Sequence, residues 1–176
     1  MAHLSWFQKL YWRYLSKPVE NRALYQHVIN QPVGAILEIG IGNAERLKQV
    51  LSLVTVRSDF AQLRYAGVDL FESGNPGDGH LRLKEVHRML AEKNIKAHLI
   101  PGDAASSLAR VAHSVLPCDL IIIDHGWNET SAEGAALDQW LPRLAQVDSA
   151  IFARQNRDQA FSRVAFPVSV EVRKAA

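Results

Sequence analysis

The stretch that decides the fold is AILEIGIGN, which occupies residues 35–43. Its first part, residues 35–39, is an apolar run without alternation, as expected for a strand buried on both faces of a parallel sheet. The run passes directly into Gly40-Ile41-Gly42, and two glycines in such a turn permit a tight bend and the close approach of a ligand. From residue 44 to residue 54 the apolar spacing becomes helical. The stretch therefore predicts a strand, a glycine turn and a helix.

The same alternation continues along the chain. Further strands are expected at residues 65–70, 97–100, 119–124 and 149–153, and helices at residues 80–93, 104–115 and 132–144. Alternating strands and helices are typical of a parallel sheet with helices on both faces. We therefore predict an α/β protein: a three-layer αβα sandwich with a Rossmann-like, mostly parallel sheet. The β-branched residues of 163–172 predict a short C-terminal edge.

Two short helices are expected before the first strand, over residues 3–15 and 23–29. Pro18 and Pro32 follow them, and Asn21 is placed to cap the second. The first helix has an aromatic face that is too apolar to stay in water, made of Trp6, Phe7, Leu10, Tyr11 and Tyr14. We expect residues 1–32 to act as a lid over the site or as an interface with a second subunit.

Composition indicates one globular domain over residues 1–176, because 48% of the residues are hydrophobic and 22% are charged. The single cysteine excludes an internal disulfide and a cysteine cluster for zinc, which fits a cytoplasmic location. No apolar run approaches the length of a membrane span, so we expect no membrane partner. The formal net charge is +2, and the basic residues gather only loosely near the N-terminus. Nucleic acid is therefore an open but less favoured partner.

Acidic residues lie within a few residues of the ends of three predicted strands. They are Asp69, Asp103 and Asp124, and ligands of open parallel sheets bind beyond the carboxyl ends of the strands. The carboxylate of Asp69 suits the two hydroxyls of a ribose, and that of Asp103 could accept from the amino group of an adenine. Each acid could instead cap a helix or serve a structural role, and the glycines could form only a tight turn.

The spacing of the glycines separates two kinds of adenosine ligand. A dinucleotide site requires a third glycine five residues after Gly40, where this chain has Glu45. A carboxylate there would repel a pyrophosphate at the start of the helix. An adenosine ligand without phosphates, such as S-adenosylmethionine, therefore fits better.

Residues 33–153 resemble the class I S-adenosylmethionine-dependent methyltransferases. The resemblance is carried by the segments at residues 37–43, 67–71, 101–104 and 119–125. It implies that S-adenosylmethionine is the cofactor and that it is bound by Glu38, Gly40, Gly42, Asn43, Asp69, Leu70, Gly102, Asp103 and Ala104. One departure is Ala44, which replaces the last glycine of the family's first motif.

The resemblance also implies roles for individual residues. Glu38 would orient the glycine loop and the amino group of the cofactor, and Asp69 would hold the ribose with Leu70 beside the adenine. Asp124 and His125 would lie nearest the methyl group and its acceptor. His125 is thus a candidate general base, although it could equally be an ordinary loop residue.

The expected function is methyl transfer to a small-molecule acceptor that the sequence does not identify. Trp127 could line the acceptor pocket or serve only in packing. No metal is expected, since Arg154-Gln155-Asn156 follows the fifth strand, where metal-using relatives place acids. Two alternatives stay open: a cofactor-binding but catalytically silent partner module, and an RNA or protein methyltransferase. A homodimer also stays open.

Overall fold

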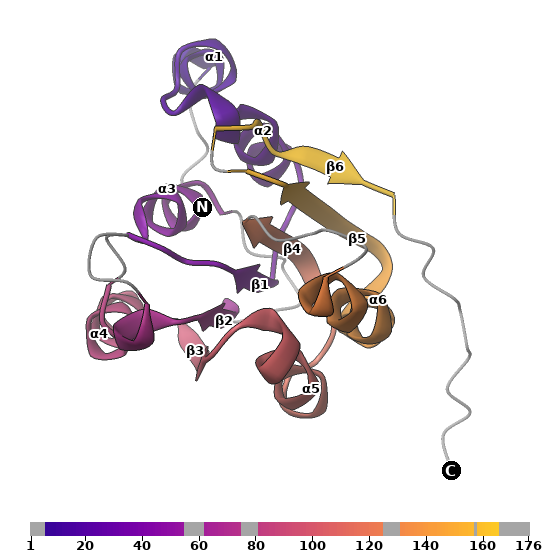
Figure 1. The fold of residues 1–176 in the computed structure, drawn as a ribbon. Helices are drawn as coiled ribbons and strands as arrows, with labels where there is room; N and C mark the ends of the chain where they lie inside the picture. The colour runs from indigo at the N-terminus through magenta and orange to yellow at the C-terminus, as the bar shows by residue number, and fades with distance from the viewer. Residues whose placement is uncertain (1–5, 55–61, 75–80, 125–130, 157, 166–176) are drawn as a thin grey trace.

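The computed structural model describes residues 6–54, 62–74, 81–124, 131–156 and 158–165. Its described strands form a six-stranded sheet in the order β3-β2-β1-β4-β5-β6 (Figure 1). The last strand is antiparallel to β5, and the other neighbouring pairs are parallel. The strands are β1 (Ala35–Ile39), β2 (Arg64–Asp69), β3 (Lys96–Pro101), β4 (Cys118–Asp124), β5 (Ala145–Arg154) and β6 (Ser162–Val164). The chain order reverses between β1 and β4, which is where ligands of such sheets bind.

Helices cover both faces of this sheet and bury two apolar clusters against it. One cluster lies under α2 (Arg22–Asn30), α3 (Glu45–Leu53) and α4 (Leu83–Glu92). The other lies under α5 (Ala104–Ser114) and α6 (Ala132–Leu144). The remaining elements are α1 (Trp6–Tyr14), which packs on α2, and the short helices η1 (Val19–Asn21) and η2 (Phe71–Ser73).

This architecture confirms the predicted three-layer α/β fold with a mostly parallel sheet. β1 has the predicted bounds, 35–39. The strand predicted at residues 149–153 was too short, because β5 begins at Ala145. The register of β5 against β4 shifts between Cys118 and Leu120. The predicted cap at Asn21 was wrong: its side chain makes no cap hydrogen bond and donates instead to the Tyr25 hydroxyl, at 2.8 Å. Residues 166–172 of the predicted edge lie outside the described residues.

The alternation of side chains along the strands places the polar strand-end residues on one face. Ile36, Tyr65, Leu120 and Phe152 all belong to the cluster under α2, α3 and α4. Because strand side chains alternate with a period of two, Glu38, Asp69, Asp124 and Arg154 lie on that same face. The N-terminal end of α3 is therefore the element that meets them.

None of the helices in the described part of the chain has both the length and the apolar character needed to cross a membrane.

Candidate functional site at the carboxyl ends of the strands

The glycine turn after β1 adopts the backbone conformation that its sequence predicts. Gly40 and Gly42 have φ angles of 85° and 64°, and Ala44, which precedes α3, has a φ of 57°. These left-handed conformations suit glycine and are costly for most other residues. A Cβ built on Gly42 would have no atom within 4 Å, so open space lies beside its backbone. The turn therefore leaves backbone accessible at the end of β1.

Asp69 connects the end of β2 to this turn. Its Oδ2 accepts a hydrogen bond from the backbone N–H of Gly42 at 2.7 Å, and its Oδ1 accepts from that of Phe71 at 3.1 Å. The backbone N–H of Gly102, beyond β3, donates to the Asp69 carbonyl at 2.9 Å. Asp69 is only 4% exposed. The predicted ligand-binding ends of β1, β2 and β3 are thus held together through this residue.

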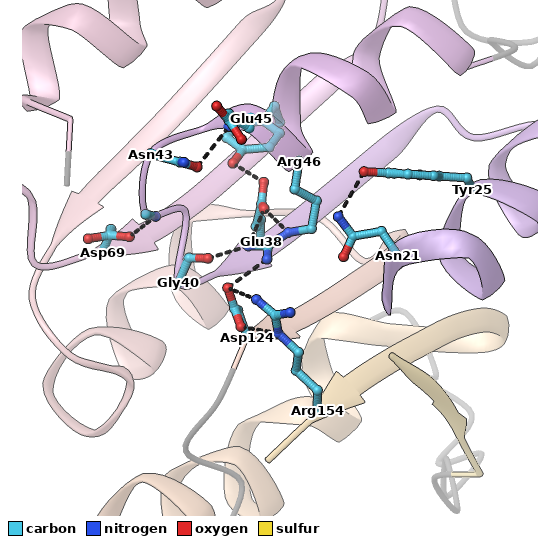
Figure 2. A network of polar contacts seen from close by, with 12 residues as sticks. Asn21, Tyr25, Glu38, Gly40, Asn43, Glu45, Arg46, Asp69, Asp124 and Arg154 are labelled. Atoms are coloured by element: carbon cyan, nitrogen blue, oxygen red, sulfur yellow. Dashed lines mark hydrogen bonds and ion pairs between the residues drawn. The ribbon is translucent and has the colours of Figure 1, made fainter. Parts of the chain in front are cut away.

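The most extensive polar network of the site surrounds Arg46, in the first turn of α3 (Figure 2). Its Nε donates to Glu38 Oε1 at 2.8 Å, and its NH1 donates to Asp124 Oδ2 at 2.6 Å. Its NH2 donates to the Gly40 carbonyl. The arginine is 7% exposed and Glu38 is 1% exposed. One buried cation therefore joins the ends of β1 and β4.

A second arginine completes the network at the end of β5. Arg154 Nε and NH2 donate to the two carboxylate oxygens of Asp124 at 2.5 Å and 3.0 Å. The ring of Phe161 lies beside both guanidiniums, 4.7 Å from the Cζ of Arg154 and 5.2 Å from that of Arg46. Two cations and two carboxylates thus alternate as Glu38–Arg46–Asp124–Arg154, and an aromatic ring covers them.

The surroundings shift the acidities of these groups in different directions. Burial alone would raise the pKa of Asp124, but the hydrogen bonds of Arg154 and the charge of Arg46 outweigh it and lower the pKa. Burial raises the pKa of Glu38 against the opposing attraction of Arg46. Burial also raises the pKa of Tyr65, whose hydroxyl donates to Glu38 Oε2 at 2.7 Å. Asp124 is therefore a stable anion and a poor proton acceptor.

The lowered pKa of Asp124 predicts a pH-dependent contribution of Arg154 to stability. A carboxylate with a lowered folded pKa stabilises the fold above its unfolded value, near 4, and this stability is lost as the pH falls through the folded pKa. We expect Arg154→Gln to lower the free energy of unfolding by about 1–3 kcal/mol at pH 7. This deficit should begin to shrink as the pH falls below about 4 and should be lost as the pH falls through the lowered folded pKa of Asp124.

Urea unfolding at several pH values measures this effect. Arg110→Gln is the control, since Arg110 is exposed and its guanidinium donates to the Pro101 carbonyl rather than to a carboxylate. Its effect should not change with pH. An Arg154→Gln deficit that stays constant down to pH 3 would show that the ion pair with Asp124 does not stabilise the fold.

The network gives Glu38 and Asp124 different surroundings from those that the resemblance implies. Both oxygens of Glu38 are engaged within the chain, one by Arg46 and one by Tyr65. Asp124 lies between two arginines. The amino-group role of Glu38 and the catalytic role of Asp124 stay predictions, and this geometry favours a structural role for each. We therefore do not assign Asp124 as a base.

The loop after β3 carries the predicted adenine contacts. Asp103 caps α5: its Oδ1 accepts from the backbone N–H of Ser106 at 2.7 Å. This hydrogen bond lowers the pKa of the exposed Asp103 carboxyl. Gly102 has a φ of 134°, which other residues rarely adopt, and a Cβ there would lie 2.5 Å from Ser107 Oγ, so the backbone and the nearby α5 both favour glycine. The structure thus gives Asp103 and Gly102 local roles, and their contact with an adenine stays a prediction.

Three further predicted residues follow the carboxyl ends of β1, β2 and β3. Asn43 Oδ1 accepts from the backbone N–H of Glu45 at 3.1 Å, Leu70 is 39% exposed and Ala104 is buried in the first turn of α5. His125 and Trp127 lie outside the described residues. Among the residues that the structure describes, no three His, Cys, Asp or Glu side chains gather as metal ligands would.

Sequence reasoning missed Arg46, Tyr65, Arg154 and Phe161. A signal existed for Arg46, because a cation in the first turn of a helix opposes the positive end of the helix dipole and requires nearby acids. Its neighbours Ala44 and Leu47 are buried in the apolar cluster. Arg154 entered the sequence analysis only as a residue that argues against a metal, and Phe161 follows a loop whose path the sequence does not indicate.

Comparisons with known proteins concern the fold. Neither protein-family models nor curated proteins gave a match. Solved structures did. A Staphylococcus aureus protein provisionally assigned as a caffeoyl-CoA O-methyltransferase has a TM-score of 0.52 at 16% identity, over 84% of this chain and 62% of that one. A methyltransferase from Geobacter sulfurreducens has a TM-score of 0.51 at 14% identity, over 79% and 63%.

A third similar structure is the methyltransferase of Podospora anserina bound to S-adenosylhomocysteine (SAH). Its TM-score is 0.51 at 11% identity, over 79% of this chain and 53% of that one. The chain spans less than two thirds of the length of each of these three proteins. At such identities the likeness concerns the fold. The chain has the Rossmann-like fold of the class I S-adenosylmethionine-dependent methyltransferases.

Proposed function

We propose that this protein binds S-adenosylmethionine at the carboxyl ends of β1, β2 and β4 and transfers its methyl group to a small molecule. The observation that carries the proposal is the hydrogen bond from Gly42 N–H to Asp69 Oδ2, at 2.7 Å. It fixes the acid at the end of β2 beside a glycine turn that has open space next to it, and this turn follows β1, one of the two strands between which the chain order reverses. This is the arrangement that a ribose-bearing ligand needs.

The residues fit the adenosine half of the cofactor. A carboxylate offers about four lone pairs, so Asp69 can accept from ribose hydroxyls while it holds the turn. Glu45 is exposed in the first turn of α3. Its negative charge disfavours a pyrophosphate at that helix end, and this supports S-adenosylmethionine over a dinucleotide.

This chain can contribute to methyl transfer by positioning the acceptor relative to the methyl group. The bound sulfonium supplies an activated methyl group, so the protein needs chiefly to align the acceptor and exclude water. The network of Arg46 fixes the ends of β1 and β4 relative to one another. We infer that this network holds the strand ends in a fixed geometry on one side of the site.

One observation favours the second candidate, a cofactor-binding but catalytically silent module. Arg46 already donates to Glu38, to Asp124 and to the Gly40 carbonyl. These acceptors at the ends of β1 and β4 are also the ones that the ammonium group of a bound amino acid would use. A ligand ammonium would therefore compete with the chain's own guanidinium.

The two candidates separate in a transfer assay with S-adenosylmethionine labelled at its methyl group. The purified protein is incubated with small-molecule, RNA and protein fractions of a cell extract, and heat-treated protein is the control. The enzyme proposal expects label in the small-molecule fraction. Label in RNA or protein would contradict the proposed acceptor, and binding of the cofactor without any transfer would favour the silent module.

A further inference from the structure

The first helix presents apolar side chains to solvent instead of burying them all. Trp6 is 68% exposed, Phe7 is 74% exposed and Leu15, just after the helix, is 64% exposed. Leu10, Tyr11, Tyr14 and Val19 are exposed as well. We call these seven residues the α1 apolar face. Large exposed apolar patches mark sites of interaction, and seven such side chains within residues 6–19 make this segment a candidate for one.

The opposite side of α1 is the one that anchors it. Trp12 packs edge to face on Tyr25 with ring centroids 5.4 Å apart, and the buried Ser16 donates to the Trp12 carbonyl at 2.8 Å. Tyr25 belongs to the main apolar cluster. Figure 1 shows α1 on the outer side of α2, away from the sheet. The α1 apolar face is therefore held outward on a docked helix.

The charge of this segment is of one sign. Residues 1–17 include Lys9, Arg13 and Lys17 and no aspartate or glutamate, and the first acid of the chain is Glu20. Glu20 follows Val19 at the end of the face, so lysine and arginine outnumber acids over residues 1–20 by three to one. An apolar surface with a mainly positive charge is complementary to a surface that is both apolar and anionic.

These features discriminate among the partners that could cover the face. A second copy of the chain would bring the same cations together across a two-fold axis, which costs electrostatic energy. An RNA could stack on the aromatic rings, but Leu10, Leu15 and Val19 offer no stacking surface. In a lipid interface, Trp and Tyr lie at the level of the headgroups, aliphatic side chains enter the acyl region and Lys and Arg meet anionic lipids.

We propose that α1 binds the surface of an anionic lipid bilayer and holds the protein at the membrane as a peripheral protein. This proposal departs from the sequence-based expectation of no membrane partner, which considered only spanning segments. The contact requires no spanning helix, because an interfacial helix lies in the plane of the membrane. It rests on α1 alone and not on the methyl-transfer proposal.

Co-sedimentation with vesicles tests the proposal. We expect the full chain to partition at least about tenfold more strongly onto phosphatidylcholine vesicles containing about 30% phosphatidylglycerol than onto pure phosphatidylcholine, and added salt to weaken that binding. Phe7→Gln/Leu15→Gln should lower partition by about tenfold or more, since two large apolar side chains no longer enter the lipid. Lys9→Gln/Arg13→Gln should lower the preference for anionic vesicles by about tenfold or more.

The matched control is Leu116→Gln/Val147→Gln, which removes two apolar side chains that are 66% and 70% exposed away from α1. It should partition like the parent chain. The proposal is overturned if the parent does not bind vesicles, or if the α1 variant and the control partition equally. It is also overturned if light scattering shows a dimer that Phe7→Gln/Leu15→Gln dissociates, or if α1 binds RNA and not lipid.

Discussion

Replacing Arg46 by alanine should destabilise the protein more than any other single change discussed here. The substitution leaves Glu38 and Asp124 buried on the same face without the cation between them. Removal of one partner from a buried ion pair costs about 3–5 kcal/mol, because an uncompensated charge stays behind. For a chain of this size, that loss lowers the melting temperature by roughly 6–20 °C.

The loss of unfolding free energy in Arg46→Ala should also depend on pH. Without Arg46, burial raises the folded pKa of Glu38 further above its unfolded value. An ionised carboxylate of this kind destabilises the fold at neutral pH. Protonation removes this destabilisation as the pH falls through the folded pKa. The deficit of Arg46→Ala should therefore be smaller at about pH 5 than at pH 7.

Thermal and urea unfolding measure both effects, and α3 offers a matched control. Lys48→Ala removes an exposed cation from the same helix and should change the unfolding free energy by no more than about 0.5 kcal/mol. The neutral combination Glu38→Gln/Arg46→Met/Asp124→Asn should recover at least about half of the loss. A loss below about 1 kcal/mol for Arg46→Ala, or no recovery in the combination, contradicts the assigned network.

The second large effect is expected at Asp69. Asp69→Ala removes the acceptor proposed for the ribose hydroxyls, and loss of a hydrogen bond to a charged group should reduce affinity for SAH by roughly tenfold to a hundredfold. The same change leaves the N–H groups of Gly42 and Phe71 without their acceptor. The unfolding free energy should therefore also fall, by about 1–3 kcal/mol.

Two variants separate the loss of binding from the loss of stability. Asp69→Asn keeps the size and one acceptor oxygen, so it should lose less stability than Asp69→Ala while it still weakens binding. Ser131→Ala removes the cap of α6, at a cost of about 1 kcal/mol, and should leave the affinity for SAH unchanged, because Ser131 is none of the predicted cofactor-binding residues. If Asp69→Ala binds SAH as well as the parent does, the ribose assignment is wrong.

The sequence predicted the sheet better than it predicted the site. The apolar run at 35–39 and the aliphatic run of β4 specify buried parallel strands, since few other structures accommodate them. The glycine turn was also predictable, because Gly40 and Gly42 have positive φ angles that their residue type permits. Local chemistry decides both features, so they can be inferred from one sequence.

The partners of Glu38 and Asp124 could not be predicted in the same way. Arg46 is 78 residues from Asp124 in sequence, and Arg154 is 30 residues from it. Their contacts depend on the strand order and on which strand positions share a face, and neither is known before the fold is. The sequence therefore indicated Asp124 as an acid beside the methyl group, but it did not indicate that two arginines of the chain bind this acid.

The exposed residues of α1 show what a helical pattern in the sequence does not predict. Its aromatic residues were expected to pack over the site or against another subunit, because such a surface is costly in water. In the structure Trp12 is the aromatic residue of α1 that packs on Tyr25, while Trp6 and Phe7 face solvent. Helical periodicity identifies an apolar face, but it does not identify what covers that face.

Isothermal titration calorimetry with SAH and with NAD, on the unmodified chain, tests the central claim most directly. The claim is that the turn after β1 and the acid after β2 form a site for an adenosine ligand without phosphates. We expect SAH to bind with a dissociation constant on the order of micromolar, or about −8 kcal/mol, and NAD to bind far more weakly because Glu45 opposes its pyrophosphate. Tighter binding of NAD than of SAH, or no heat of binding with SAH, would contradict the account.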